Sequence, residues 1–337
     1  MKFLVTGVAG FIGFHVAQSL LKAGHEVIGL DNLNNYHQDI NLKIARLKIN
    51  ADYMSFSFRK VDISDYAEVI DVFQSNAVQR VIHLAAQTGV RYSVKNPIAY
   101  ANSNLVGHLN ILECCRHNNV EHFLYASSSS VYGLNRKMPF SVDDDTTHPV
   151  SIYAATKKSN ELMSHTYSHL YGIPTTGLRF FTAYGPWGRQ DMALFKFTRA
   201  ILSGQSINIY NYGKMQRDFT YIDDIVQAIM VLHNIIPTVN SDWTAEGGNI
   251  ASSSAAYQLF NIGNNRPHAL MTYIKALEDE LGIVAKKNML PVQPGDMIST
   301  SADISDLVKI IGYQPYTEIQ EGVCRFVKWY KEFYKIT

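Results

Sequence analysis

The chain has 337 residues, of which 47% are apolar, and its 30 Lys and Arg residues balance 29 Asp and Glu residues. The resulting net charge of +1 gives no electrostatic footprint for nucleic acid or for an anionic membrane. Three cysteines, two of them adjacent, make neither a disulfide framework nor a metal site, which suits a reducing cytoplasm. The apolar start is too short to span a bilayer, so we expect a soluble cytoplasmic protein built from two compact units.

Short apolar, strand-like segments alternate with amphipathic helical segments through the first half of the chain. Gly24 lies where the first helix should end, directly before the second strand. This alternation predicts an α/β fold with a Rossmann-type, doubly wound parallel sheet that helices cover on both faces. The predicted strands are 2–6, 26–30, 56–61, 80–84, 122–126 and 176–181, and the predicted helices are 11–23, 66–75, 97–117 and 153–171.

The second half of the chain is less regular. We assign residues 1–181 to the Rossmann domain, with a return segment around 217–240, and 182–337 to a smaller mixed α/β domain that binds the substrate. A polar loop at 238–256, rich in Ser, Gly and Asn, receives no role. The predicted helices here are 193–203, 223–233, 271–281 and 318–334, and the predicted strands are 207–212 and 257–263.

A glycine motif, "VTGVAGFIG", joins the first strand to the first helix. Gly7, Gly10 and Gly13 permit a tight turn and a close approach of the backbone to a pyrophosphate at the helix N-terminus. Asp31 ends the second strand, where a carboxylate accepts hydrogen bonds from the ribose hydroxyls and repels a 2′-phosphate. The context therefore predicts a dinucleotide site that prefers NAD over NADP.

The segment "SIYAATKKS" places Tyr153 and Lys157 at positions i and i+4 of a predicted helix, where side chains are neighbours. A lysine beside a phenol favours the phenolate and lowers the pKa of the tyrosine. The pair is therefore a candidate base for alcohol chemistry. Because the spacing also occurs by chance, the other motifs must decide between this role and an ordinary solvated helix face.

The motifs together resemble the nucleotide-sugar epimerases of the extended short-chain dehydrogenase/reductase superfamily. The segments "GVAGFIG", "HLAAQ", "ASSSSVYG", "YAATK", "RFFTAYGPWG" and "RDFTYIDD" follow in that family's order along essentially the whole chain. The sequence around "HPVSIYAATKKSNELM" is most similar to that of members that act on UDP-glucuronate. The resemblance implies reversible C4 epimerisation of UDP-glucuronate to UDP-galacturonate through a 4-keto intermediate, with tightly bound NAD, in a homodimer that supplies polysaccharide synthesis.

The resemblance also implies roles for individual residues. Tyr153 is the catalytic base and acid, Lys157 binds the nicotinamide ribose and holds the pKa of Tyr153 down, and Ser128 assists them. The tandem serines leave that last assignment uncertain by one position. The residues implied in cofactor binding are Gly7, Gly10, Phe11, Ile12, Gly13, Asp31, Asn32, Asp62, Ile63, Leu84, Ala85, Ala86, Gln87, Asn104, Ser127, Tyr153 and Lys157. Those implied in substrate binding are Arg91, Ser93, Ser128, Ser129, Thr182, Arg189, Arg217 and Asp296, and no metal site is predicted.

A 4-keto uronate is a β-keto acid, which loses CO₂ when its C5–carboxylate bond stands perpendicular to the carbonyl plane. An epimerase must therefore fix the orientation of the carboxylate, which the planar fork of an arginine can do. Arg189 and Thr182 are the candidates, with Arg91 as a third contact, whereas Arg217 is implied to hold the UDP diphosphate.

Two other functions stay open, and two more are disfavoured. The same fold also carries UDP-glucuronate decarboxylases and 4-epimerases of UDP-glucose or UDP-N-acetylglucosamine. Sugar dehydration is disfavoured, because Ser129 and Ser130 stand where the family's dehydratases place an Asp-Glu pair. A catalytically silent NAD-binding regulator is disfavoured too, since such a protein needs no intact set of Ser128, Tyr153 and Lys157.

Overall fold

The computed structural model describes residues 1–36, 40–293, 297–312 and 314–336. A seven-stranded sheet with the order β10-β6-β5-β4-β1-β2-β3 forms its centre, and every neighbouring pair in it is parallel. This is the Rossmann arrangement that the alternating pattern predicts. The strands are β1 (Lys2–Thr6), β2 (Glu26–Asp31), β3 (Phe56–Lys60), β4 (Arg80–His83), β5 (His122–Ser128), β6 (Thr175–Phe180) and β10 (Tyr257–Ile262).

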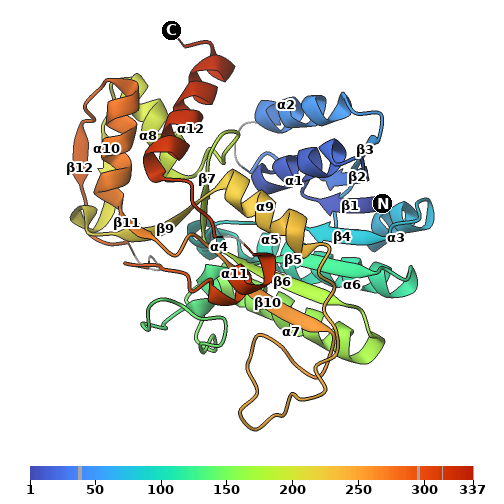
Figure 1. Cartoon of the computed structure of the whole chain (residues 1–337). Coiled ribbons are helices and arrows are strands. Elements are labelled where there is room, and N and C mark those ends of the chain that lie inside the picture. Colours follow the sequence, from blue (N-terminus) through green and yellow to red (C-terminus); the bar gives the residue numbers. More distant parts are fainter. Residues whose placement is uncertain (37–39, 294–296, 313, 337) are drawn as a thin grey trace.

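The inner strands of the sheet are buried on both faces, and side chains alternate between two hydrophobic clusters along β1, β2, β4, β5 and β10. In β1, Phe3 and Val5 belong to one cluster and Leu4 to the other. Figure 1 shows α1 and α9 on one side of the sheet, and α6 and α7 on the other. The first layer contains α1 (Phe11–Lys22), α2 (Ile40–Ala51), α9 (Ile222–Leu232) and α11 (Ser305–Ile311), and the second α3 (Tyr66–Gln74), α4 (Val90–Lys95), α5 (Pro97–Tyr100), α6 (Gly107–His117) and α7 (Ile152–Tyr171).

A smaller unit lies beyond the carboxyl ends of the central strands (Figure 1). One small sheet contains β7 (Thr182–Tyr184), β9 (Gln216–Tyr221) and β11 (Pro267–Ala269). A second contains β8 (Ile207–Ile209) and β12 (Lys287–Met289). The helices α8 (Ala193–Leu202), α10 (Leu270–Leu281) and α12 (Ile319–Tyr334) complete this unit, and the short helices η2 (Ser129–Tyr132) and η3 (Tyr210–Gly213) lie in connections.

The chain returns to the central sheet later than the sequence predicts. The expected return segment 217–240 covers α9, which packs against α1. However, β10 also joins the sheet, beside β6, although residue 257 lies in the region assigned to the smaller domain. The part of the chain that contributes to the central sheet therefore extends to β10. The helices α2, α4 and α11 and the strands β7, β9, β11 and β12 are absent from the expected set. The apolar periodicity of α2 is weak, and α4 and α11 are short.

The predicted helix at 97–117 is confirmed, but it contains an irregular turn. Residues Ala101–Val106 form a π-helix, η1, between α5 and α6. Such a turn accommodates one extra residue and frequently marks a functional site. Within the described ranges, no helix is both long and apolar enough to cross a membrane, and no group of side chains is placed to hold a metal ion.

Candidate active site

The glycine loop between β1 and α1 leaves no room for larger side chains. Gly7 has φ +69°, and a Cβ atom there would lie 2.8 Å from the backbone nitrogen of Ala85, in the loop after β4. A Cβ on Gly13 would lie 2.2 Å from the carbonyl oxygen of Gly7. Only glycine therefore fits at these two positions of the tight turn before α1, which is the geometry of a pyrophosphate-binding loop, and this turn fits NAD.

Asp31 ends β2 and is directed at the same loop. One carboxylate oxygen accepts the N–H of Ala9 at 3.2 Å, and the other accepts the N–H of Leu33 at 2.8 Å and the ammonium of Lys43 at 3.1 Å. The next residue, Asn32, donates to Asp62 at 2.9 Å. Burial raises the pKa of Asp62, but hydrogen bonds from Asn32 and Ser64 outweigh it and hold that pKa below its usual value. Two predicted cofactor residues are thereby linked.

The loop after β4 is held by hydrogen bonds to the side chains of Thr6 and Asn104. The hydroxyl of Thr6 accepts the N–H groups of Leu84 and Ala85 at 3.1 and 3.0 Å. The amide of Asn104, in η1, accepts the N–H of Gln87 at 2.8 Å and donates to its carbonyl at 3.0 Å. Asn104 also donates to the hydroxyl of Thr156, between Tyr153 and Lys157 in sequence, at 3.0 Å. The π-turn thus connects the loop that carries Ala86 and Gln87 to the catalytic helix.

The structure brings the three predicted catalytic residues together. Ser128 at the end of β5 makes a side-chain hydrogen bond with Tyr153 of α7. The ammonium of Lys157 donates to the carbonyl of Ala126 at 2.9 Å, and burial lowers its pKa to about 7.

Burial also raises the pKa of Tyr153, and the groups that act against it are Ser128 and the charge of Arg189. Lys157, which was expected to hold the pKa of Tyr153 down, is not among the groups that shift it. The reason is that the ammonium of Lys157 is desolvated and is engaged by the carbonyl of Ala126.

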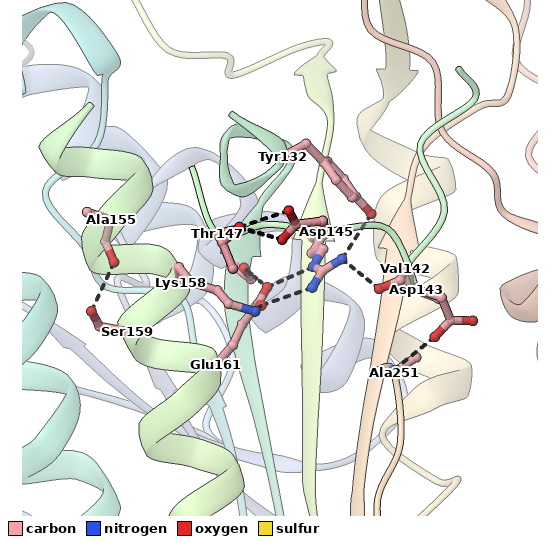
Figure 2. Close-up of polar contacts among 12 residues, drawn as sticks. Tyr132, Val142, Asp143, Asp145, Thr147, Ala155, Lys158, Ser159, Glu161 and Ala251 are labelled. Carbon is pink, nitrogen blue, oxygen red and sulfur yellow. Dashed lines mark hydrogen bonds and ion pairs between the residues drawn. The ribbon is translucent and has the colours of Figure 1, made fainter. Parts of the chain in front are cut away.

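The tandem serines point in different directions, which the sequence could not decide. Ser127 donates at 2.6 Å to Glu161, which lies farther along α7 than Tyr153, and its hydroxyl is therefore engaged within the protein. Figure 2 shows the side chains of Lys158 and Glu161 on α7 directed toward each other. The ammonium of Lys158 donates to Oε2 of Glu161 at 3.3 Å. There the guanidinium of Arg179 in β6 binds both oxygens of Glu161 at 2.8 and 3.0 Å. The pair Arg179–Glu161 is almost fully buried.

Thr182 and Arg189 line one pocket together with Phe11, which follows the glycine loop. The guanidinium of Arg189 lies within electrostatic reach of Tyr153, and its fork binds Asp191 with two hydrogen bonds of 3.0 and 2.6 Å. The predicted carboxylate-binding arginine therefore already holds a carboxylate of this chain.

The other predicted substrate residues are more scattered. The guanidinium of Arg91 lies 4.8 Å from the ring centre of Tyr210 in η3. Arg217 donates to the carbonyl of Ile298 at 3.0 Å, beside a second pocket lined by Gly213–Gln216 and Ser299. Ser93 is fully buried and donates to the carbonyl of Val90, so its hydroxyl does not reach the pocket. Ser129 begins η2, and Asp296 lies outside the described residues.

Two residues of the site escaped the sequence analysis. Arg46 lies on α2, which was not predicted, and its guanidinium binds the carbonyls of Ala9 at 2.7 Å, Trp187 at 2.5 Å and Gly188 at 3.2 Å. It therefore joins the glycine loop to the loop that carries Arg189. Asp191 stands two positions after Arg189, and this spacing of opposite charges was the only available signal.

Comparisons with known proteins agree with this geometry. A model of the NAD dependent epimerase/dehydratase family matches residues 3–240. A probable UDP-glucuronate 4-epimerase of Rhizobium meliloti (strain 1021) is 45% identical over 99% of this chain and 98% of its own length.

Two solved structures have the same fold. A UDP-glucuronic acid 4-epimerase of Bacillus cereus, in complex with UDP-glucuronic acid and NAD, is 32% identical with a TM-score of 0.88, over 99% of this chain and 100% of that one. A UDP-glucose 4-epimerase of Thermotoga maritima with UDP-glucose is 29% identical with a TM-score of 0.84, again over 99% and 100%.

Proposed function

Because this chain belongs to the NAD dependent epimerase/dehydratase family, we propose that it interconverts UDP-glucuronate and UDP-galacturonate at C4 with tightly bound NAD. The observation that carries the proposal is the place of Arg189. This cation lines a pocket with Thr182, at the glycine loop, and its charge reaches the phenol of Tyr153. In a uronate the carboxylate is attached to C5, next to the reacting C4, and it would therefore meet Arg189 in this pocket.

The catalytic residues divide the proton transfer between them. Tyr153 removes the proton of the 4-hydroxyl at its phenolic oxygen, and Ser128 orients the two oxygens through its hydrogen bond to the phenol. Bound NAD would supply the hydride acceptor and donor at C4, and its positive nicotinamide would favour the phenolate. Tyr153 returns its proton to the C4 oxygen when the ketone is reduced, so the reaction has no net redox change. Lys157, whose pKa of about 7 leaves it partly protonated at neutral pH, holds the ribose beside them.

The substrate-binding residues keep the intermediate in place between the two hydride transfers. Arg217 anchors the diphosphate while the 4-keto sugar turns about its bonds. Arg189 and Thr182 hold the carboxylate away from the perpendicular orientation, so that CO₂ is not lost. The cofactor residues are those of the glycine loop, Asp31 and Asn32, Asp62 and Ile63, Leu84–Gln87, Asn104 and the main chain at Ser127.

A second candidate is 4-epimerisation of UDP-glucose or UDP-N-acetylglucosamine. One observation favours it. The guanidinium of Arg189 is already paired with Asp191, so the site does not need a carboxylate on the substrate and can accept a sugar whose C6 group is neutral. Decarboxylation of UDP-glucuronate is the third reading, and it would follow if Arg189 failed to restrain the carboxylate.

The experiment is to incubate the purified protein with UDP-glucuronate, without added NAD, and to follow the sugar by proton NMR. We expect UDP-galacturonate and no pentose or CO₂. A UDP-pentose would identify a decarboxylase. If UDP-glucuronate is unchanged with NAD added, but UDP-glucose or UDP-N-acetylglucosamine is epimerised, the second candidate is correct.

We also propose that the protein is a cytoplasmic homodimer. Apolar side chains are exposed along the helix at 97–117 and on α7, which pack beside each other, and a second copy can cover them. Leu109 and Leu162 are 40% and 58% exposed, whereas Leu112 on the same helix is buried within the chain. Sedimentation equilibrium should give twice the mass of the chain, and a Leu109→Glu, Leu162→Glu double variant should give the monomer mass. A wild-type monomer would contradict the proposal.

A further inference from the structure

The ion pair between Arg189 and Asp191 has the geometry of a carboxylate-binding site that is already filled. Two parallel hydrogen bonds join the guanidinium nitrogens Nε and Nη2 to the two carboxylate oxygens, at 3.0 and 2.6 Å. This bidentate arrangement is the one that a uronate carboxylate would adopt on the same fork. The two side chains are 25% and 30% exposed, so the pair is open to exchange.

The backbone around Arg189 is held on both sides. Arg46 binds the carbonyls of Trp187 and Gly188, and the ring of Trp187 packs against those of Phe14 and Trp329. On the other side, the amide of Gln190 donates to the hydroxyl of Tyr334 at 3.2 Å. A change of partner at Arg189 therefore requires only side-chain rotation, without movement of the loop.

Asp191 has a second favourable environment when it leaves Arg189. It stands directly before α8, whose N-terminus lacks a side-chain cap and favours a negative charge. Lys196, in the first turns of α8, is within electrostatic reach, because the charge of Asp191 acts to raise the pKa of Lys196 against the burial that lowers it. The released carboxylate therefore stays compensated, which keeps the cost of exchange small.

We propose that Asp191 is a specificity-determining residue, whose carboxylate occupies the fork of Arg189 until the carboxylate of a UDP-uronate displaces it. A neutral sugar has no group that can replace Asp191, so it binds with the ion pair closed. A uronate gains the arginine but must displace an internal competitor first. This inference rests on the proposed function, since it assigns the carboxylate of UDP-glucuronate to Arg189.

The test measures binding in a Tyr153→Phe background, where turnover is blocked, by titration calorimetry with UDP-glucuronate, UDP-glucose and UDP. Asp191→Asn keeps the shape of the side chain but removes the competing charge. We expect it to tighten UDP-glucuronate binding by about tenfold, because a charge-assisted pair is replaced by a weaker neutral one, and to leave UDP-glucose and UDP unchanged. Asp191→Glu, which restores the carboxylate, should return the affinities toward those of the parent.

The control is Glu26→Gln, which removes the partner of Lys2 at 3.1 Å at the opposite ends of the central strands and should change no affinity. If Asp191→Asn leaves the ratio of the UDP-glucuronate and UDP-glucose affinities unchanged, the inference is wrong. If it weakens UDP-glucuronate alone, Asp191 holds Arg189 in its receiving position and the competition is also refuted. The NMR assay on the wild-type chain separates these results from a failure of the proposed function, which would show as no UDP-galacturonate.

Discussion

At the scale of single residues, the roles that are hardest to assign from the sequence belong to identical neighbours. Ser127 and Ser128 are adjacent serines, yet one donates to Glu161 and the other contacts Tyr153, which lies about two turns earlier on the same helix α7. The sequence predicted that a serine in this stretch assists Tyr153. Which serine does so depends on the strand's phase relative to α7, and the local pattern does not record it.

Ser128→Ala should lower kcat for UDP-glucuronate by about 10²-fold, because the phenol loses the group that orients it toward the 4-hydroxyl. The NAD content of the purified protein should stay at the wild-type level. Turnover is measured by proton NMR, and the NAD content is measured as the NAD released when the protein is heated.

The matched control for this variant is Ser130→Ala. Its main-chain N–H, the donor to the Ser128 hydroxyl at 3.1 Å, remains in place, so near-normal turnover is expected. Full activity in Ser128→Ala would remove this residue from the proposed mechanism.

At the scale of secondary structure, two features join the elements of the site. The π-turn η1 places Asn104 where it can bind both the loop after β4 and Thr156 of the catalytic helix. The sequence predicted this helix, but one extra residue in a turn scarcely alters a pattern of apolar residues over 97–117. Similarly, nothing in the local pattern of α7 or β6 indicated that Glu161 and Arg179 would meet in the interior.

The buried pair Arg179–Glu161 should be important for stability as well as for the alignment of α7 with β5 and β6. Glu161→Gln is expected to lower the free energy of unfolding by about 3 kcal/mol, because it leaves the buried guanidinium without a compensating charge. Adding Arg179→Met should recover part of that loss. Urea unfolding followed by circular dichroism measures both changes.

The control for the buried pair is Glu321→Gln, which removes an exposed partner of Arg325 on α12 and should change stability by less than about 1 kcal/mol. Equal effects of Glu161→Gln and Glu321→Gln would contradict a special role for the buried pair.

At the scale of the whole molecule, the sequence predicted the parallel sheet and its first six strands, because strands buried on both faces carry strong apolar runs. It did not predict that β10 completes the sheet beside β6 (Figure 1). Between these two strands the chain passes through the smaller unit and then through the polar loop at 238–256. That pairing depends on which edge of the sheet is left open once β6 is in place. No local pattern encodes it.

Buried neutral imidazoles make the whole fold sensitive to acid. The neutral ring of His122 donates from Nδ1 to the carbonyl of His233 at 3.1 Å and accepts at Nε2 from the hydroxyl of Thr176 at 2.8 Å. Burial lowers the pKa of His122 to about 4, with the charges of Arg80 and His233 acting in the same direction, and it lowers the pKa of His233 to about 4 as well.

The unfolded chain therefore binds protons below pH 6.5 that the folded chain does not bind until about pH 4, and stability falls as the pH drops through this interval. Between pH 7 and 5 we expect each such histidine to cost about 1–2 kcal/mol. His122→Gln should reduce the loss, and exposed His148→Gln should not, as judged by urea midpoints at the two pH values. A pH-independent midpoint in the wild-type chain would contradict this prediction.

The guanidinium of Arg46 touches the carbonyl of Ala9 in the glycine loop and those of Trp187 and Gly188 before Arg189, so one rigid group borders both ligand sites. Any adjustment of the glycine loop that moves Ala9 must therefore be transmitted to the backbone that presents Arg189. Thermodynamic reciprocity then requires that the nucleotide sugar strengthen the hold on the dinucleotide by the same factor by which the dinucleotide strengthens the hold on the sugar. The protein should consequently bind NAD more tightly when UDP is also bound, a difference that the Kd for NAD, measured by equilibrium dialysis with and without UDP, would reveal.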